Sequence, residues 1–335
     1  MLIDSFWKKG TKFLGTQYAV MCGAMSWVSE HHLVAAVSNA GAFGVLAGGA
    51  MPPEMLSGEI DEIRKLTDKN FGVNIMTMHP QIEELVAVCV RQKVSHVILG
   101  GGIPNVAWVK TLKDAGIKVM CFAPALVLAK KLLRSGVDAL ILEGTEAGGH
   151  IGPVATNVLV QEILPAVKDV PVFVAGGIGS GEMMAAFLAM GAAGCQLGTR
   201  FVCATECVAH PNFKQAFIKA NARDAVPTVQ LDARFPVIPV RALANEGTKR
   251  FMAFQLEMIE KYQRGEVELK DAQMQIEHFW GGALRRAVID GDVENGSVMA
   301  GQSVGLVKDI KPAADIVREL VADAEDALNR WRRQA

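Results

Sequence analysis

The chain has 335 residues, of which 50% are hydrophobic, and its mean hydropathy of +0.24 allows a large buried core. Its formal net charge of −1 excludes the basic character of a typical nucleic-acid-binding protein. The six cysteines are scattered and form no CxxC pair, which predicts buried free thiols and no metal site.

The first residues contain no basic stretch followed by an apolar core and a small-residue cleavage site, so we expect no secretory signal. No apolar run reaches the ~18 residues of a membrane span without a charge or a glycine. We therefore expect a cytoplasmic protein that binds neither membranes nor nucleic acid.

Short apolar runs alternate with amphipathic segments over about the first 200 residues. Expected strands cover 18–22, 43–47, 71–76, 95–99, 118–121, 137–142, 171–174 and 194–197, and helices lie between them. Eight such units predict a closed (β/α)8 TIM barrel. The doubly wound open sheet is the competing fold, but no G-x-G-x-x-G follows the first strand with an acid ~20 residues later.

Residues 209–290 break this alternation. They contain helical stretches at 213–222 and 248–264 and a proline-bearing loop at 234–239. We predict a mostly helical insertion that forms a lid over the barrel mouth. Residues 1–208 and 291–335 would form the barrel domain, which ends in an amphipathic helix near 312–332.

Three glycine-rich loops follow expected strands, at the end where barrel enzymes place their active sites. The loop 143–152 carries two carboxylates, four glycines and His150, which suggests a backbone pressed against a flat ligand that the histidine faces. Gly176 and Gly177, and then Gly198 and Thr199, offer amides and a helix start for a phosphate. The alternative is that these glycines only permit tight turns.

Four pieces of the sequence carry a family resemblance: FGVN at 71–74, EAGGH at 146–150, VAGGI at 174–178 and QLGTRF at 196–201. Together they resemble the FMN-binding nitronate monooxygenases, formerly called 2-nitropropane dioxygenases, and the flavin-type enoyl-acyl-carrier-protein reductase. The likeness covers nearly the whole chain, and residues 296–302 resemble the reductase branch more closely.

The resemblance implies FMN as cofactor and His150 as the catalytic residue near flavin N5. Gly23, Ala24 and Met25 would run beside the isoalloxazine, although the family's Pro and Gln-Gly-Gly-Met sequence is replaced here. The implied cofactor-binding residues are Gly23, Ala24, Met25, Asn74, Glu143, Gly148, Gly176, Gly177, Gln196, Gly198 and Thr199.

The resemblance supports two activities on small-molecule substrates. The first is oxidation of alkyl nitronates with O2 through the flavin, and we take it as the leading prediction. The alternative is reduction of an enoyl thioester, with NAD(P)H as electron donor. A non-catalytic flavin-binding protein is the third hypothesis, and a homodimer is the expected assembly.

Overall fold

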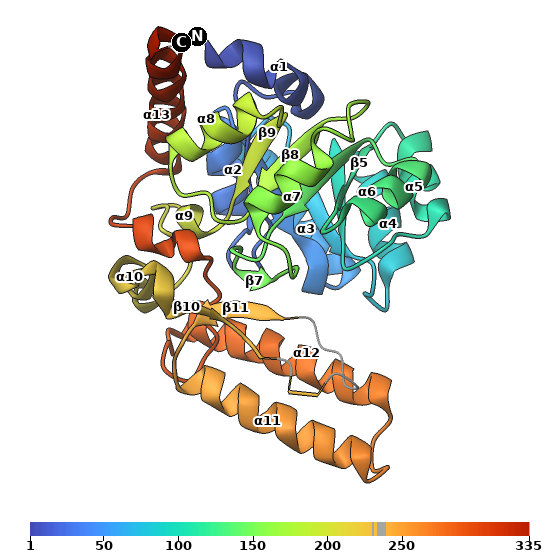
Figure 1. Ribbon diagram of the computed structural model, residues 1–335. Helices are drawn as coiled ribbons and strands as arrows, with labels where there is room; N and C mark the ends of the chain where they lie inside the picture. Colours follow the sequence, from blue (N-terminus) through green and yellow to red (C-terminus); the bar gives the residue numbers. More distant parts are fainter. Residues whose placement is uncertain (230, 233–238, 335) are drawn as a thin grey trace.

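The computed structural model describes residues 1–229, 231–232 and 239–334 (Figure 1), so the expected loop at 234–239 lies outside the described residues except for Pro239. Parallel strands close into a barrel in the order β1-β2-β3-β4-β5-β6-β8-β9, which confirms the predicted TIM barrel. Their bounds are β1 Val20–Cys22, β2 Phe43–Ala47, β3 Gly72–Met76, β4 His96–Gly100, β5 Lys118–Phe122, β6 Ala139–Glu143, β8 Val172–Ala175 and β9 Gly194–Leu197.

Helices on the outside of the barrel cover these strands. Strands β2 and β4 are buried along their whole length, as expected for parallel strands whose two faces are both covered. Side chains fix several helix starts; Ser180, for example, accepts the Met183 amide at 3.2 Å. The bounds are α2 His31–Asn39, α3 Pro53–Leu66, α4 Ile82–Arg91, α5 Val106–Asp114, α6 Leu126–Arg134, α7 Thr156–Ile163 and α8 Gly181–Ala189.

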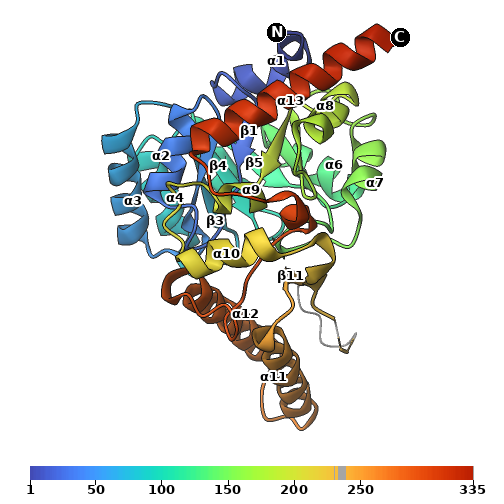
Figure 2. The ribbon, with the colours of Figure 1, turned by 90° about the vertical axis from the view of Figure 1, so that its left-hand side faces the viewer.

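An N-terminal helix, α1 (Ile3–Leu14), was not among the predicted elements. It packs where strands begin, and Gly10 permits this contact because a Cβ there would lie 1.9 Å from the Ala193 carbonyl oxygen. The final helix, α13 (Ala313–Gln334), lies along α8 (Figure 2). Its Glu325 carboxylate accepts the Leu2 and Ile3 amides, both at 2.8 Å, and thereby caps α1.

The segment after β9 contains the expected helices and also strands that were not predicted. Strands β10 (Ala225–Pro227) and β11 (Val240–Leu243) join β7 (Gly149–His150) in a second sheet, ordered β10-β11-β7. Figure 1 shows the α11–α12 hairpin beyond this sheet, on the side of the barrel where β7 lies. The helices and turns are α9 Thr199–Val202, α10 Pro211–Lys219, η2 Ala222–Asp224, α11 Glu246–Gln263, α12 Leu269–Arg285, η3 Arg286–Asp290 and η4 Gln302–Leu306.

Aromatic side chains hold the hairpin together. The Phe251 and Trp280 rings lie 4.1 Å apart between their centroids, and Phe254 stacks on Phe279. The part of the chain that the structure describes contains no candidate membrane-spanning helix.

Candidate active site

Glu143 ends strand β6 and starts the loop 143–152, which carries His150 and which we call the histidine loop. Its side chain is only partly exposed, and burial raises the pKa of the carboxyl to about 7, while the nearby His150 ring opposes this rise. Glu143 can therefore gain or lose a proton near neutral pH.

The loop after Glu143 folds onto the start of helix α7. The Glu146 carboxylate accepts hydrogen bonds from the Thr156 amide at 2.9 Å and from its hydroxyl at 2.8 Å. A Cβ at Gly144 would lie 2.3 Å from the Thr156 amide nitrogen, so only glycine allows this approach. Sequence reasoning did not assign Glu146 or Thr156, because their pairing depends on the folded loop.

His150 lies on strand β7, at the edge of the second sheet. Val240 pairs with His150 and Arg241 with Gly149 in an antiparallel ladder, and Ile151 donates to the Pro239 carbonyl at 3.0 Å. Gly149 has φ of 75°, a conformation that favours glycine. The predicted catalytic histidine is thus held in place by the segment 209–290.

Gly176 and Gly177 follow strand β8 and lie against the histidine loop. Both have positive φ, 92° and 72°. A Cβ at Gly176 would lie 3.2 Å from the Gly144 amide nitrogen, and one at Gly177 would lie 3.2 Å from the Glu146 Cβ. The start of α8 follows four residues later, so two predicted phosphate-binding glycines lie between that helix and the histidine loop.

The predicted residues at the ends of β1 and β9 also meet. The Gly23 amide donates to the Leu197 carbonyl at 2.9 Å, and a Cβ at Gly23 would lie 3.2 Å from Gln196 Nε2. Next to them, a Cβ at Gly198 would lie 3.3 Å from Met25 Sδ. Ala24, between Gly23 and Met25, is partly exposed.

Asn74 ends up across the barrel from β8, because strand β3 is several strands away in the barrel order. Its side chain is 9% exposed, and Nδ2 donates to the Ile98 carbonyl at 3.1 Å. Its Oδ1 would be 3.5 Å from a Cβ at Gly49. The predicted residues therefore lie at the ends of strands on opposite sides of the barrel.

A C-terminal segment that sequence reasoning did not assign to the site, 299–303, fits between the histidine loop and β9. The Gln302 amide donates to the Glu146 carbonyl at 2.9 Å, and the Gly301 amide donates to Thr199 Oγ1 at 3.0 Å. A Cβ at Gly148 would lie 2.6 Å from the Ala300 carbonyl carbon. The family resemblance of 296–302 was the only signal for this role.

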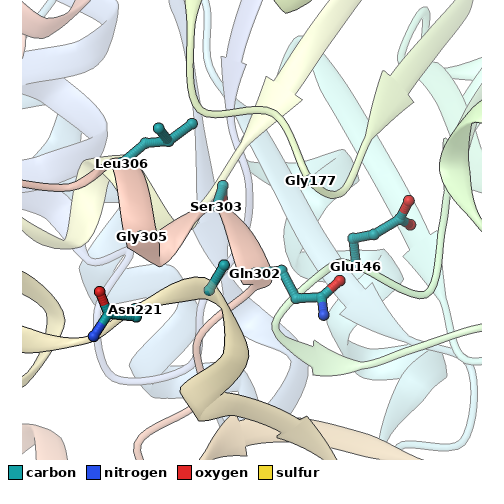
Figure 3. Close-up of a pocket in the computed structure, with 8 residues that line it drawn as sticks. Glu146, Gly177, Asn221, Gln302, Ser303, Gly305 and Leu306 are labelled. Carbon is teal, nitrogen blue, oxygen red and sulfur yellow. The ribbon is translucent and has the colours of Figure 1, made fainter.

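A cavity of about 390 Å³ lies beside this junction (Figure 3). Glu146, Gly177 and Gln302 line one part of it, and Asn221 approaches from the segment before β10. It reaches Gly177 but not the other predicted phosphate-binding residues.

One group of metal-ligand side chains lies elsewhere, at the start of α2. Glu30, His31 and His32 bring their ligand atoms within 4.8 Å of one another. Their contacts are those of a helix start: Glu30 accepts the His32 and Leu33 amides, and His31 Nδ1 lies 2.9 Å from the Glu59 carboxylate. His31 is partly exposed and His32 is exposed.

Comparisons with known proteins point to one family. The family profile described as "Nitronate monooxygenase" matches residues 8–88 and 81–323. The chain is 31% identical to an indene-4-carboxyl-CoA dehydrogenase, in full (3aS,4S,5R,7aS)-5-hydroxy-7a-methyl-1-oxo-octahydro-1H-indene-4-carboxyl-CoA dehydrogenase, of Rhodococcus jostii, covering 96% of this chain and 98% of the relative. It is 28% identical to a nitronate monooxygenase of Paraburkholderia phytofirmans, covering 96% of each.

Solved structures with similar folds support the same family assignment. FabK from Thermotoga maritima superposes with a TM-score of 0.86 at 38% identity, covering 97% of this chain and 98% of that chain. A nitroalkane oxidase from Streptomyces ansochromogenes superposes with a TM-score of 0.80 at 26% identity, covering 96% and 99%. The similarity therefore extends over the barrel, the second sheet and the α11–α12 hairpin.

Proposed function

The chain belongs to the nitronate monooxygenase family of oxidoreductases, and on this premise we propose that it binds FMN at the barrel mouth and uses His150 beside the flavin. The observation that carries this proposal is that the loops after β6, β8 and β9 lie together. Gly176, after β8, packs against Gly144, after β6. The segment 299–303 joins the loop after β6 to Thr199, after β9.

The residues present suit a flavin nucleotide. Gly176 and Gly177 have conformations that favour glycine, and their backbone precedes the N-terminal end of α8, a pattern that suits a phosphate. Gln196, Gly198 and Thr199 would complete this phosphate site from the end of β9. Gly23, Ala24 and Met25, with Glu143, Gly148 and Asn74, would line the ring and the ribityl chain.

FMN, when bound, supplies the electron transfer. The protein's part is to bind, to orient and to move protons. His150 can accept or donate a proton at one ring nitrogen and place a substrate at the mouth. Glu143, with its pKa near 7, can hold a proton close by.

Alkyl nitronates are the first candidate substrates. Acyl thioesters are the second, and a specific observation favours them: the chain is 38% identical to FabK and 31% identical to a CoA-thioester dehydrogenase, but 26–28% identical to the nitroalkane and nitronate enzymes. For a thioester, NAD(P)H would be the electron donor in reduction.

Spectroscopy tests the cofactor, and anaerobic mixing separates the substrates. We expect the visible spectrum of the purified protein to show the absorbance of a bound flavin. Bleaching by a nitronate but not by NADH supports the monooxygenase; bleaching by NADH and recovery on adding an enoyl thioester supports the reductase. Protein that is colourless and does not bind added FMN would refute the proposal.

A substitution tests the histidine. We expect His150→Ala to retain FMN and to lose turnover by about 10²–10⁴-fold, the usual contribution of a general acid–base group. The matched control is His278→Ala, because His278 is an exposed histidine on α12. Equal turnover in the two variants would remove His150 from the mechanism.

A further inference from the structure

We propose that Arg241 is a positioning residue that fixes the histidine loop and thereby sets where the His150 ring lies in the barrel mouth. The inference deepens the proposed function and rests on it only for the role of His150. Arg241 belongs to strand β11, in the segment after the barrel, and not to the barrel itself.

The side chain of Arg241 bridges the two segments. It is 4% exposed, although arginine is rarely buried without a partner. Its Nε donates to the Thr145 carbonyl, within the histidine loop, at 2.9 Å, and its Nη1 donates to the Ala225 carbonyl on β10. One guanidinium thus satisfies backbone carbonyls on both sides of the junction.

The backbone of Arg241 holds the same loop a second time. Arg241 pairs with Gly149 and Val240 pairs with His150 in the β11–β7 ladder. The loop is therefore attached through a side chain at Thr145 and through a strand at Gly149 and His150. Residues 145–150 have little freedom to move unless β11 moves with them.

The charge of Arg241 also acts on this loop. Burial lowers the pKa of the guanidinium, and the Glu146 carboxylate opposes that effect. Glu146 in turn caps α7 through Thr156. Arginine suits the position because its planar group presents several donors in fixed directions, whereas the lysine ammonium is a compact charge on a flexible stem.

The test combines amide hydrogen exchange on the FMN-free protein with steady-state kinetics of the holoenzyme. The first variant is Arg241→Met, which removes the positive charge and the hydrogen-bond donors. The second is Arg241→Lys, which keeps the charge and can still donate to one of the two carbonyls. The control is Arg223→Met, because the Arg223 side chain is 89% exposed on the same segment.

We expect exchange in residues 144–152 to become at least about tenfold faster in Arg241→Met, since the loop loses a tether. We expect kcat to fall by about 10–10²-fold, as for a catalytic group displaced by ~1 Å, with KM and FMN affinity within about threefold of the control. Arg241→Lys should recover part of kcat, and it keeps the test available if Arg241→Met does not fold.

Exchange in 144–152 equal to that of Arg223→Met would overturn the inference. So would faster exchange with an unchanged kcat, because the loop's position would then not matter. Faster exchange and lower kcat, together with full turnover in His150→Ala, would support the tether and refute the proposed role of His150 instead. The two proposals therefore fail separately.

Discussion

The hydroxyl of Thr199 accepts the Gly301 amide at 3.0 Å, and this hydrogen bond joins the end of strand β9 to the C-terminal segment. Thr199 is 9% exposed, so the bond is protected from water. The residue predicted to hold the phosphate also fixes the segment that packs against Gly148 and Glu146.

Substituting Thr199 tests how much this hydrogen bond stabilises the protein. We expect Thr199→Val to lower the free energy of unfolding by about 1–3 kcal/mol, because it leaves a buried amide without an acceptor. Thr199→Ser keeps the hydroxyl and should lie within about 1 kcal/mol of the parent. Urea unfolding followed by circular dichroism measures both. An unchanged free energy of unfolding in Thr199→Val, which keeps the threonine methyl group and loses only the hydroxyl, would show that this hydrogen bond does not stabilise the protein.

Gly148 tests the close packing at the same junction. An alanine Cβ there would lie 2.6 Å from both the Ala300 carbonyl carbon and the Gly301 amide nitrogen, so backbone must move. We expect Gly148→Ala to destabilise the protein by about 1–3 kcal/mol, the range for overpacking. Gly58→Ala is the control: nothing lies within 4 Å of its Cβ position in helix α3, and alanine should stabilise that helix by up to ~1 kcal/mol. Thermal unfolding measures the Tm of both variants, and Tm shifts of the same sign would contradict this prediction.

The raised pKa of Glu143 leads us to expect that activity depends on pH. Burial raises the pKa of its carboxyl to about 7, so the group is neutral below that pH and charged above it. Because the proposed role of Glu143 is to hold a proton, we expect kcat to fall as pH rises through about 7. Glu143→Gln cannot ionise and should remove this limb in profiles measured from pH 5 to 9. A limb that persists at the same pH in Glu143→Gln belongs to another group.

His96, at the opposite end of the barrel, predicts a pH dependence of stability. Its ring is 1% exposed, with Nε2 3.0 Å from the Phe13 carbonyl of α1, and burial lowers its pKa from 6.5 to about 4. A depressed histidine pKa means that the unfolded chain binds the proton more readily. This contribution is therefore complete above pH 6.5 and is lost as pH falls towards 4, by up to about 3 kcal/mol.

Urea unfolding at pH 7 and at pH 4.5 measures this loss. We expect the difference between the two pH values to be smaller in His96→Gln than in the parent by about 2–3 kcal/mol. Comparing the two proteins also cancels the contribution of Glu143, whose raised pKa acts in the opposite direction. The same difference in both proteins would assign the acid sensitivity to other groups.

The barrel could be predicted from the sequence because each strand is a short apolar run that the fold buries on both faces. Strand β2, for example, is buried throughout, and its sequence alone signals this. Helix α1 was missed: it contains Lys8, Lys9 and Gly10, and its apolar positions face a surface that only exists once the barrel has closed.

The residues themselves mark the candidate site mainly by their glycines, whereas Asn74 and Gln196 were proposed from the family resemblance. Gly176 and Gly177 stand out in the sequence because turns with positive φ need glycine. Arg241 carries no such mark, since its partners Thr145 and Ala225 are distant in sequence and offer only backbone carbonyls. The two-residue strand β7 was missed because its partner strand β11 is also distant in sequence. The roles of the site residues and the boundaries of the lid remain predictions.

The β11–β7 pairing has a consequence for building chimeras within this family. A strand turns successive side chains to opposite faces, so a register slip of one residue between β11 and β7 would turn the His150 ring to the other face. A graft that exchanged residues 209–290 between two relatives, and left 144–152 behind, would have to reproduce the Val240–His150 register. The helical hairpin and the histidine loop are therefore best transplanted as one unit.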